Sequence, residues 1–116
     1  MWTILFRQRF LLWFRQQPED LREAIYASLN LLKDYGPRLA RPYADTLEGT
    51  HLPNLKELRT QYKGKPIRTF FAFDPIRRAI VLCAGDKSGD KRFYEKLIPV
   101  AEKEFKNHIQ EMENEK

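Results

Sequence analysis

The sequence predicts an α+β fold with a largely antiparallel sheet, and three observations support this. The chain has 116 residues, which is enough for one domain with its own core, spanning residues 1–116, and too few for two. Apolar residues make up 42% of it and charged residues 32%, the composition of a globular protein and not of a disordered or fibrous one. The expected order of elements is β, α, α, β, β, β, α, in which most strands follow one another directly.

The N-terminal third is expected to form one strand and two helices. Residues 2–6 are β-branched and aromatic, which favours a strand, and the aromatic residues at 10, 13 and 14 have the spacing of a short amphipathic helix. Pro18 then precedes a long helix over about 19–35, which Gly36-Pro37 should end. We expect this helix pair to cover one face of the sheet and to leave the other face free for a site.

The middle of the chain is expected to supply the antiparallel strands. Residues 36–54 are rich in Gly and Pro with weak periodicity, so they predict a long connecting loop that is either functional or held down by the sheet. Gly64 and Asp74-Pro75 then mark two hairpin turns. The strands they separate are expected at about 55–62, 67–74 and 78–85, the last one central because it is apolar on both faces.

A final helix is expected from Asp90 onward, with an apolar stripe that includes Tyr94, Ala101 and His108. Pro99 should kink or divide this helix. Residues 111–116 are strongly polar and are expected to form a frayed tail.

Charge and cysteine content restrict the function. Lysine and arginine exceed aspartate and glutamate by 21 to 16, and residues 53–92 alone carry ten basic and four acidic groups. Such a region is either a solvated basic face or a surface for an anionic partner. The single Cys83 excludes an internal disulfide and a cysteine-based zinc site, and suggests the cytoplasm. Charged residues interrupt the apolar N-terminus, so no membrane span is expected.

Metal and thiol chemistry are not expected either. His51 and His108 are 57 positions apart and have no acidic or cysteine neighbours at metal-binding spacing. His108 falls on the helical stripe and is expected to be a partly buried packing residue, whereas His51 lies in the loop and could approach a site. Cys83 lies in an aliphatic run and is expected to be an inert core thiol.

Hairpin geometry groups several polar residues. If the turn near Gly64-Lys65 has an even number of residues, position 68 lies opposite 61 and position 70 opposite 59. One face would then carry Glu57, Arg59, Gln61 and Arg68. The group is either a cross-strand salt bridge of small energetic value or an anion site bounded by a carboxylate.

A second basic group follows the third strand of the hairpins. The loop after this strand, with the turn-rich residues 85–90, adds Lys87, Lys91 and Arg92, and the start of the last helix adds Tyr94. A helix N-terminus among cations attracts anions, although a basic loop before a helix is often simply surface. The glycine spacing and the terminal Lys-Ser/Thr pair of a P-loop are absent.

These segments resemble the HigB branch of the RelE/ParE toxins of bacterial type II toxin-antitoxin modules. The resemblance rests on residues 55–59, 67–74, 81–87 and 91–94, together with the helix end at Tyr35-Gly36-Pro37, and it runs from about residue 2 to 109. It implies a RelE-like fold and a cytoplasmic, cofactor-independent and metal-independent RNase. Such an enzyme cleaves mRNA on the ribosome, inhibits translation and is held inactive by a helix-turn-helix antitoxin.

The resemblance also implies roles for single residues. Arg68 matches the arginine that holds the scissile phosphate, Tyr94 matches the aromatic hydroxyl of the last segment, and Arg92 or Lys91 matches the basic residue before it. The chain has Leu55 and Glu57 where RelE has a lysine pair, and Phe93 where several relatives have histidine. We therefore expect the catalytic set to be Glu57 as base, Arg68, and Arg92 with Tyr94 on the leaving-group side, and the RNA-binding set to be Arg59, Lys56, Lys87 and Lys91.

Two other functions fit the same fold. A non-catalytic ParE-like inhibitor of DNA gyrase would need no acid-base group, and a basic nucleic-acid-binding module would need only the charge. In either toxin case an acidic region of the antitoxin would suit this cationic chain. Phe105 and Ile109 on the last helix are a candidate surface for it.

Overall fold

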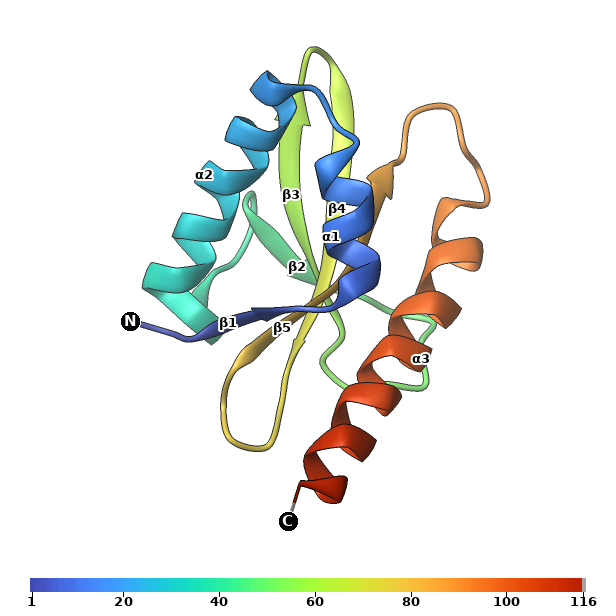
Figure 1. Cartoon of the computed structure of the whole chain (residues 1–116). Coiled ribbons are helices and arrows are strands. Elements are labelled where there is room, and N and C mark those ends of the chain that lie inside the picture. The colour runs from blue at the N-terminus through green and yellow to red at the C-terminus, as the bar shows by residue number, and fades with distance from the viewer. Residues whose placement is uncertain (116) are drawn as a thin grey trace.

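The structure is a computed structural model that describes residues 1–115, and it confirms the α+β class. Five strands form one sheet in the order β1-β5-β4-β3-β2 (Figure 1). β1 (Ile4–Phe6) runs parallel to β5 (Ala79–Asp86), while β4 (Lys65–Phe73), β3 (Lys56–Tyr62) and β2 (Ala44–Thr46) continue the sheet in antiparallel pairs. β5, the strand that was expected to be central, is therefore paired on both sides, with β1 and with β4.

Helices cover both faces of this sheet. α1 (Gln8–Arg15) and α2 (Glu19–Tyr35) pack on one face, where Phe10 and Ile25 meet Leu58, Phe71 and Val81. α3 (Phe93–Asn114) packs on the other face, and Figure 1 shows α2 and α3 on opposite sides of the strands. Its buried residues Phe93, Ile98 and Ala101 form a second core with Phe70, Ile80 and Leu82.

The expectation of one free sheet face is therefore wrong. The apolar stripe of α3 needs a partner, and the strand residues that alternate away from α1 and α2 provide it. Pro99 lies inside α3 and does not divide it. The helix continues to Asn114 where a frayed tail was expected from Glu111, and Arg7 Nη2 binds the Glu111 carboxylate at 2.8 Å within this last part. Lys116 lies outside the described residues.

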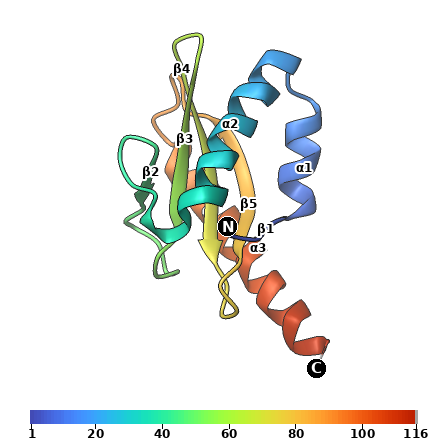
Figure 2. The ribbon, with the colours of Figure 1, turned by 90° about the vertical axis from the view of Figure 1, so that its left-hand side faces the viewer.

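The connection after α2 contains a strand that the sequence pattern did not predict. Gly36 ends α2 with a φ of +56°, and a Cβ there would lie 2.3 Å from the Trp2 indole, so glycine is required for both reasons. A short 3-10 turn, Gly36–Arg38, follows, and β2 then pairs with the first half of β3. Figure 2 shows β2 at the edge of the sheet remote from α1.

The β3–β4 hairpin has a two-residue turn, and this fixes the face of each side chain. Lys63 and Gly64 both have positive φ, as a type I′ turn requires, and Tyr62 pairs with Lys65. Arg59 therefore lies opposite Arg68 and not opposite position 70, because the turn is centred one residue earlier than expected. The pairing partner of Arg59 therefore differs by two residues from the expected one. Because side chains alternate along a strand, a shift by two residues leaves Glu57, Arg59 and Arg68 on the same face, as predicted. Within residues 1–115, no helix combines the length and apolar character needed to cross a membrane.

Candidate active site

A buried carboxylate with two arginines and a tyrosine lies where β3, β4 and the first turn of α3 meet. Arg59 and Arg68 face one another across neighbouring strands, an arrangement that is unfavourable for like charges without a counterion. Glu57, two residues before Arg59 on the same face, supplies that counterion: Arg59 Nε donates a 3.1 Å hydrogen bond to Glu57 Oε2, and Arg68 Nε lies 3.6 Å from Glu57 Oε1.

Tyr94 completes the cluster from α3. Its hydroxyl donates a 2.6 Å hydrogen bond to Glu57 Oε1, and its ring stacks on Phe70 at a centroid distance of 5.9 Å. Burial, together with the hydrogen bond to the Glu57 carboxylate, raises the pKa of Tyr94 to about 12. The phenol therefore keeps its proton at neutral pH and is a hydrogen-bond donor in the resting site.

Glu57 is the least accessible member of this group, since only 2% of its surface is exposed. Both of its carboxylate oxygens accept hydrogen bonds from side chains of the cluster. A substrate therefore reaches Arg59, Arg68 or Tyr94 before it reaches Glu57. Two guanidinium groups against one carboxylate also leave the cluster positively charged, which favours an anion.

Arg68 is partly buried, and not all of its N–H groups have a hydrogen-bond acceptor. Its side chain is 13% exposed. Nη1 donates to the Ile67 carbonyl at 3.2 Å, whereas the buried Nε has no hydrogen-bond partner within the described chain. A buried guanidinium N–H without a good acceptor is costly, so an anion that approached this group would be stabilised.

Asp45 on β2 is a member of the site that the sequence analysis missed. Its Oδ2 accepts hydrogen bonds from Arg59 Nη2 at 3.3 Å and from Arg41 Nε at 2.9 Å. The Arg41 hydrogen bond is the main cause of a lowered pKa at Asp45. Arg59 is thus held from both sides, by Glu57 and by Asp45, and β2 contributes to the site by placing the second carboxylate.

Lys87 is the one residue of the expected RNA-binding set after β5 that lies close to the cluster. It is half-buried, and its Nζ lies 5.1 Å from the centroid of the Tyr94 ring. This is within the range of a cation–π contact. The loop after β5 therefore places an ammonium group beside the phenol.

Three expected site residues are not brought into the cluster. Arg92 precedes α3, its side chain is 75% exposed, and its Nε lies 3.8 Å from Glu95. Lys91 is exposed beside it. Lys56 precedes Glu57 on β3, so its side chain leaves the opposite face of the strand, where Nζ donates to Thr46 Oγ1 at 3.1 Å.

The other ionisable groups that the sequence singled out lie elsewhere. His108 is buried, and its Nε2 lies 3.0 Å from Asp74 Oδ2, which Arg78 also binds. Cys83 is buried in the α3-side core, and burial raises the pKa of its thiol to about 12, so it stays protonated. Within residues 1–115 no group of three or more His, Cys, Asp or Glu side chains is arranged to hold a metal ion.

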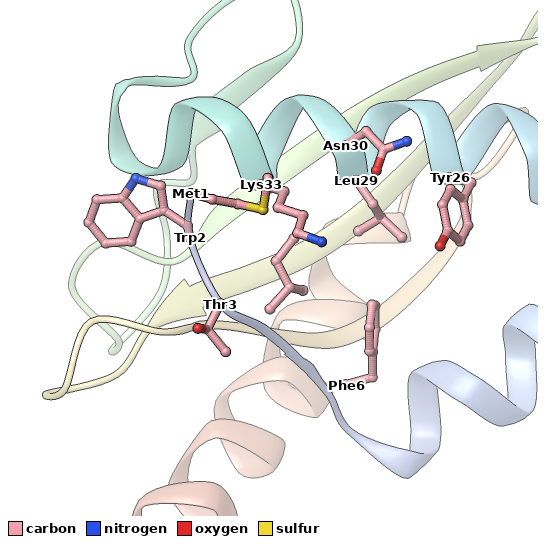
Figure 3. Close-up of a pocket in the computed structure, with 9 residues that line it drawn as sticks. Met1, Trp2, Thr3, Phe6, Tyr26, Leu29, Asn30 and Lys33 are labelled. Atoms are coloured by element: carbon pink, nitrogen blue, oxygen red, sulfur yellow. The ribbon is translucent and has the colours of Figure 1, made fainter.

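Two further hollows in the surface lack this combination of charges. One lies between β1 and α2, where Figure 3 shows Tyr26, Leu29 and Lys33 on the helix and Phe6 across from them. The other lies along α3, where Phe105 and Ile109 are half-buried beside Leu52. Neither contains the paired arginines or the buried carboxylate.

Comparison with known proteins places the chain in a family. Residues 12–106 match the family described as phage-derived protein Gp49-like (DUF891). Two relatives from Mycobacterium tuberculosis (strain ATCC 25618 / H37Rv) carry the names "Putative toxin HigB2" and "Putative toxin HigB3". HigB3 is 41% identical over 98 residues, which cover 84% of each chain. HigB2 is 35% identical over 111 residues, which cover 94% of this chain, and the match spans 55% of the length of HigB2.

The protein therefore belongs to the Gp49-like family, with HigB toxins among its relatives, and the predicted resemblance is confirmed. Solved structures show the same fold. The isolated Escherichia coli RelE toxin superposes with a TM-score of 0.61 over 84% of this chain and 96% of RelE, at 16% identity. A RelE double mutant in the free state gives a TM-score of 0.58 at 15% identity.

Proposed function

We propose that this protein is the toxin of a type II toxin-antitoxin module and inhibits translation as a metal-independent endoribonuclease that cuts mRNA on the ribosome. The observation that carries the proposal is the cluster in which one buried carboxylate holds two arginines and a tyrosine. Family membership and the names of the HigB relatives support the toxin class.

The arginines suit the phosphate. Strand cleavage by the ribose 2′-OH passes through a phosphorane whose extra negative charge must be balanced. Arg59 and Arg68 both bring a guanidinium group to the Glu57 carboxylate, and planar N–H donors match phosphate oxygens. Their carboxylate partners fix them in place before the substrate arrives, so little reorganisation is needed at the moment of reaction.

Tyr94 is proposed to be the group that exchanges a proton with the substrate. Glu57 is too buried to act as a base on the ribose directly. The Tyr94 oxygen can accept the proton of the 2′-OH while the phenol passes its own proton to Glu57 Oε1, 2.6 Å away. The carboxylate then holds the proton, the phenol is regenerated, and the 2′ oxygen attacks phosphorus.

The leaving 5′ oxygen requires a proton from another group. Lys87 lies beside Tyr94 and carries an ammonium N–H. We assign it this role in place of Arg92, whose side chain points to solvent. Once the 5′ oxygen is protonated, the P–O bond breaks and leaves a 2′,3′-cyclic phosphate on one fragment and a 5′-OH on the other.

The ribosome and an antitoxin are the partners that this proposal requires. The site lies on the surface of a small chain with a net charge of +5, so it can approach a polyanionic particle through long-range attraction. An acidic segment of a helix-turn-helix antitoxin would be attracted in the same way. The site of action would be the cytoplasm, where mRNA is translated.

Primer extension on mRNA from cells that express the protein tests the proposal. New cuts that require translation of the message are expected. Arg68→Ala should lower their yield by roughly a hundredfold or more, the usual cost of removing one donor to developing negative charge. Arg38→Ala, at an exposed arginine outside the site, should leave the cuts unchanged. An absence of cuts together with inhibition of gyrase supercoiling by the purified protein would reject the proposal.

A further inference from the structure

A groove of about 780 Å³ opens beside the two arginines, between α2 and the edge of β3. β2 pairs with only the first half of β3, and Tyr43 just before β2 accepts the Arg59 N–H, so the strand edge beyond Arg59 has no neighbouring strand on this side within residues 1–115. Small side chains on α2, Ala24 and Ala27, form one wall and leave room. Tyr43 and Gln61 also line the groove.

The groove is continuous with the candidate active site. Arg59 and Arg68 line it, and they are also the two cations that Glu57 holds. A phosphate bound by these arginines would therefore lie at the mouth of the groove. The nucleotide attached to that phosphate would have its sugar and base directed along the groove or out to solvent.

Tyr43 has the position and the exposure of a stacking platform. Its side chain is 51% exposed and lines the groove, so one face of the ring is available to a ligand that enters it. The backbone that carries it is fixed: its N–H donates to the Ala40 carbonyl at 2.9 Å, and its C=O accepts from the Arg59 N–H at 2.8 Å. Tyr43 is thereby tied to the strand that carries one phosphate-binding arginine.

The chemistry of the lining matches one nucleotide of single-stranded RNA. Guanidinium groups bind the phosphate, an exposed aromatic ring stacks on an unpaired base, and the Gln61 amide offers a donor and an acceptor to the base edge. Aromatic stacking and amide contacts are how proteins usually read unpaired bases. A purely apolar peptide segment would make no use of the net positive charge of the two arginines.

We propose that this groove is a subsite for the nucleotide next to the cleaved phosphate, with its base stacked on Tyr43 and its edge read by Gln61. The proposal rests on the proposed RNase function and adds to it a determinant of base preference. It predicts that Tyr43 contributes to RNA affinity without a charge, whereas Arg59 contributes through the phosphate.

Binding of a fluorescein-labelled hexaribonucleotide whose riboses are 2′-O-methylated, and which therefore has no free 2′-OH and cannot be cut, tests the subsite by anisotropy at several salt concentrations. Tyr43→Ala should weaken binding by about tenfold or more, the usual effect of losing one stacked base, with the salt dependence unchanged. Tyr43→Phe keeps the ring and should bind as the unmodified protein does. Arg59→Ala should instead reduce the salt slope by roughly 0.7.

Tyr35→Ala is the matched control, because Tyr35 is 49% exposed, close to the value for Tyr43, and lies at the C-terminal end of α2, outside the residues that line the groove. Equal binding by the Tyr43→Ala variant and the unmodified protein would overturn the subsite and leave the groove to a protein partner. No binding by the unmodified protein would overturn it as well. In either case the mapped mRNA cuts decide the RNase proposal separately, so the two failures are distinguishable.

Discussion

Replacing Glu57 with alanine should destabilise the protein strongly, because its carboxylate is the counterion that Arg59 and Arg68 share. Without it, Arg68 would lose its carboxylate partner and would lie directly opposite Arg59, which would keep only Asp45. The Tyr94 hydroxyl would also lose its acceptor, since it donates to Glu57 Oε1. The stability effect of Glu57 is therefore a consequence of the same contacts that organise the site.

The magnitude follows from the burial of the partners. Removing one member of a buried ion pair usually costs about 3–5 kcal/mol. The Arg68 side chain is 13% exposed and that of Arg59 is 30% exposed, so water can solvate part of the uncompensated charge. We therefore expect the lower end, about 3 kcal/mol. Glu57→Gln keeps the volume and one acceptor and should lose about 1–2 kcal/mol.

Urea unfolding followed by tryptophan fluorescence measures this, since Trp2 and Trp13 lie in the N-terminal elements. Glu23→Ala, at an exposed carboxylate on α2, is the control and should change the free energy of unfolding by less than about 0.5 kcal/mol. In an Arg68→Met background the Glu57→Ala loss should shrink, because one of the stranded charges is gone. A loss below about 1 kcal/mol for Glu57→Ala alone would refute the reasoning.

Three further predictions follow from other contacts. Tyr94→Phe keeps the ring on Phe70 and should leave stability within about 1 kcal/mol while mRNA cleavage falls by roughly a hundredfold or more; equal cleavage would exclude the proton relay. Gly36→Ala should lower the melting temperature by several degrees, since a Cβ would collide with Trp2 at positive φ. Burial alone would raise the pKa of Asp74, but hydrogen bonds from His108 and Arg78 lower it overall. This carboxylate therefore stabilises the fold above about pH 4 and loses that effect below it. Asp74→Asn should flatten the fall in stability that sets in below about pH 4, and an unchanged profile would contradict the assignment.

Local periodicity predicted most of the fold and the centre of the site. The hairpin rule placed Glu57, Arg59 and Arg68 on one face because strand side chains alternate. The predicted pairing was wrong by two residues, but an even shift does not move a side chain to the other face. The helices were predicted because their apolar stripes and the Gly36-Pro37 stop depend on neighbours in sequence.

What the sequence pattern did not predict depends on contacts between distant segments. β2 has three residues, too few for a periodic pattern, and it exists through pairing with β3. Its Asp45 reaches Arg59, 14 positions away. The burial of Glu57 likewise depends on Tyr94 and α3, 37 positions away.

Arg92 was placed at the site because it precedes Tyr94 in the family motif. Its side chain instead points to solvent, since it precedes the first residue of α3 and consecutive positions there point in different directions. The position of Arg92 next to Tyr94 in sequence therefore did not predict that the two side chains lie together. The loop residue Lys87, seven positions before Tyr94, is the cation that approaches the phenol.

The most direct test of the proposed mechanism is cleavage of a defined mRNA on purified ribosomes, with a single 2′-deoxy substitution at the position that the unmodified message shows to be cut. If the arginine cluster balances a phosphorane formed by 2′-OH attack, the deoxy message should stay intact, and the natural message should yield a 2′,3′-cyclic phosphate. Cleavage of the deoxy message at the same position and rate would contradict the account.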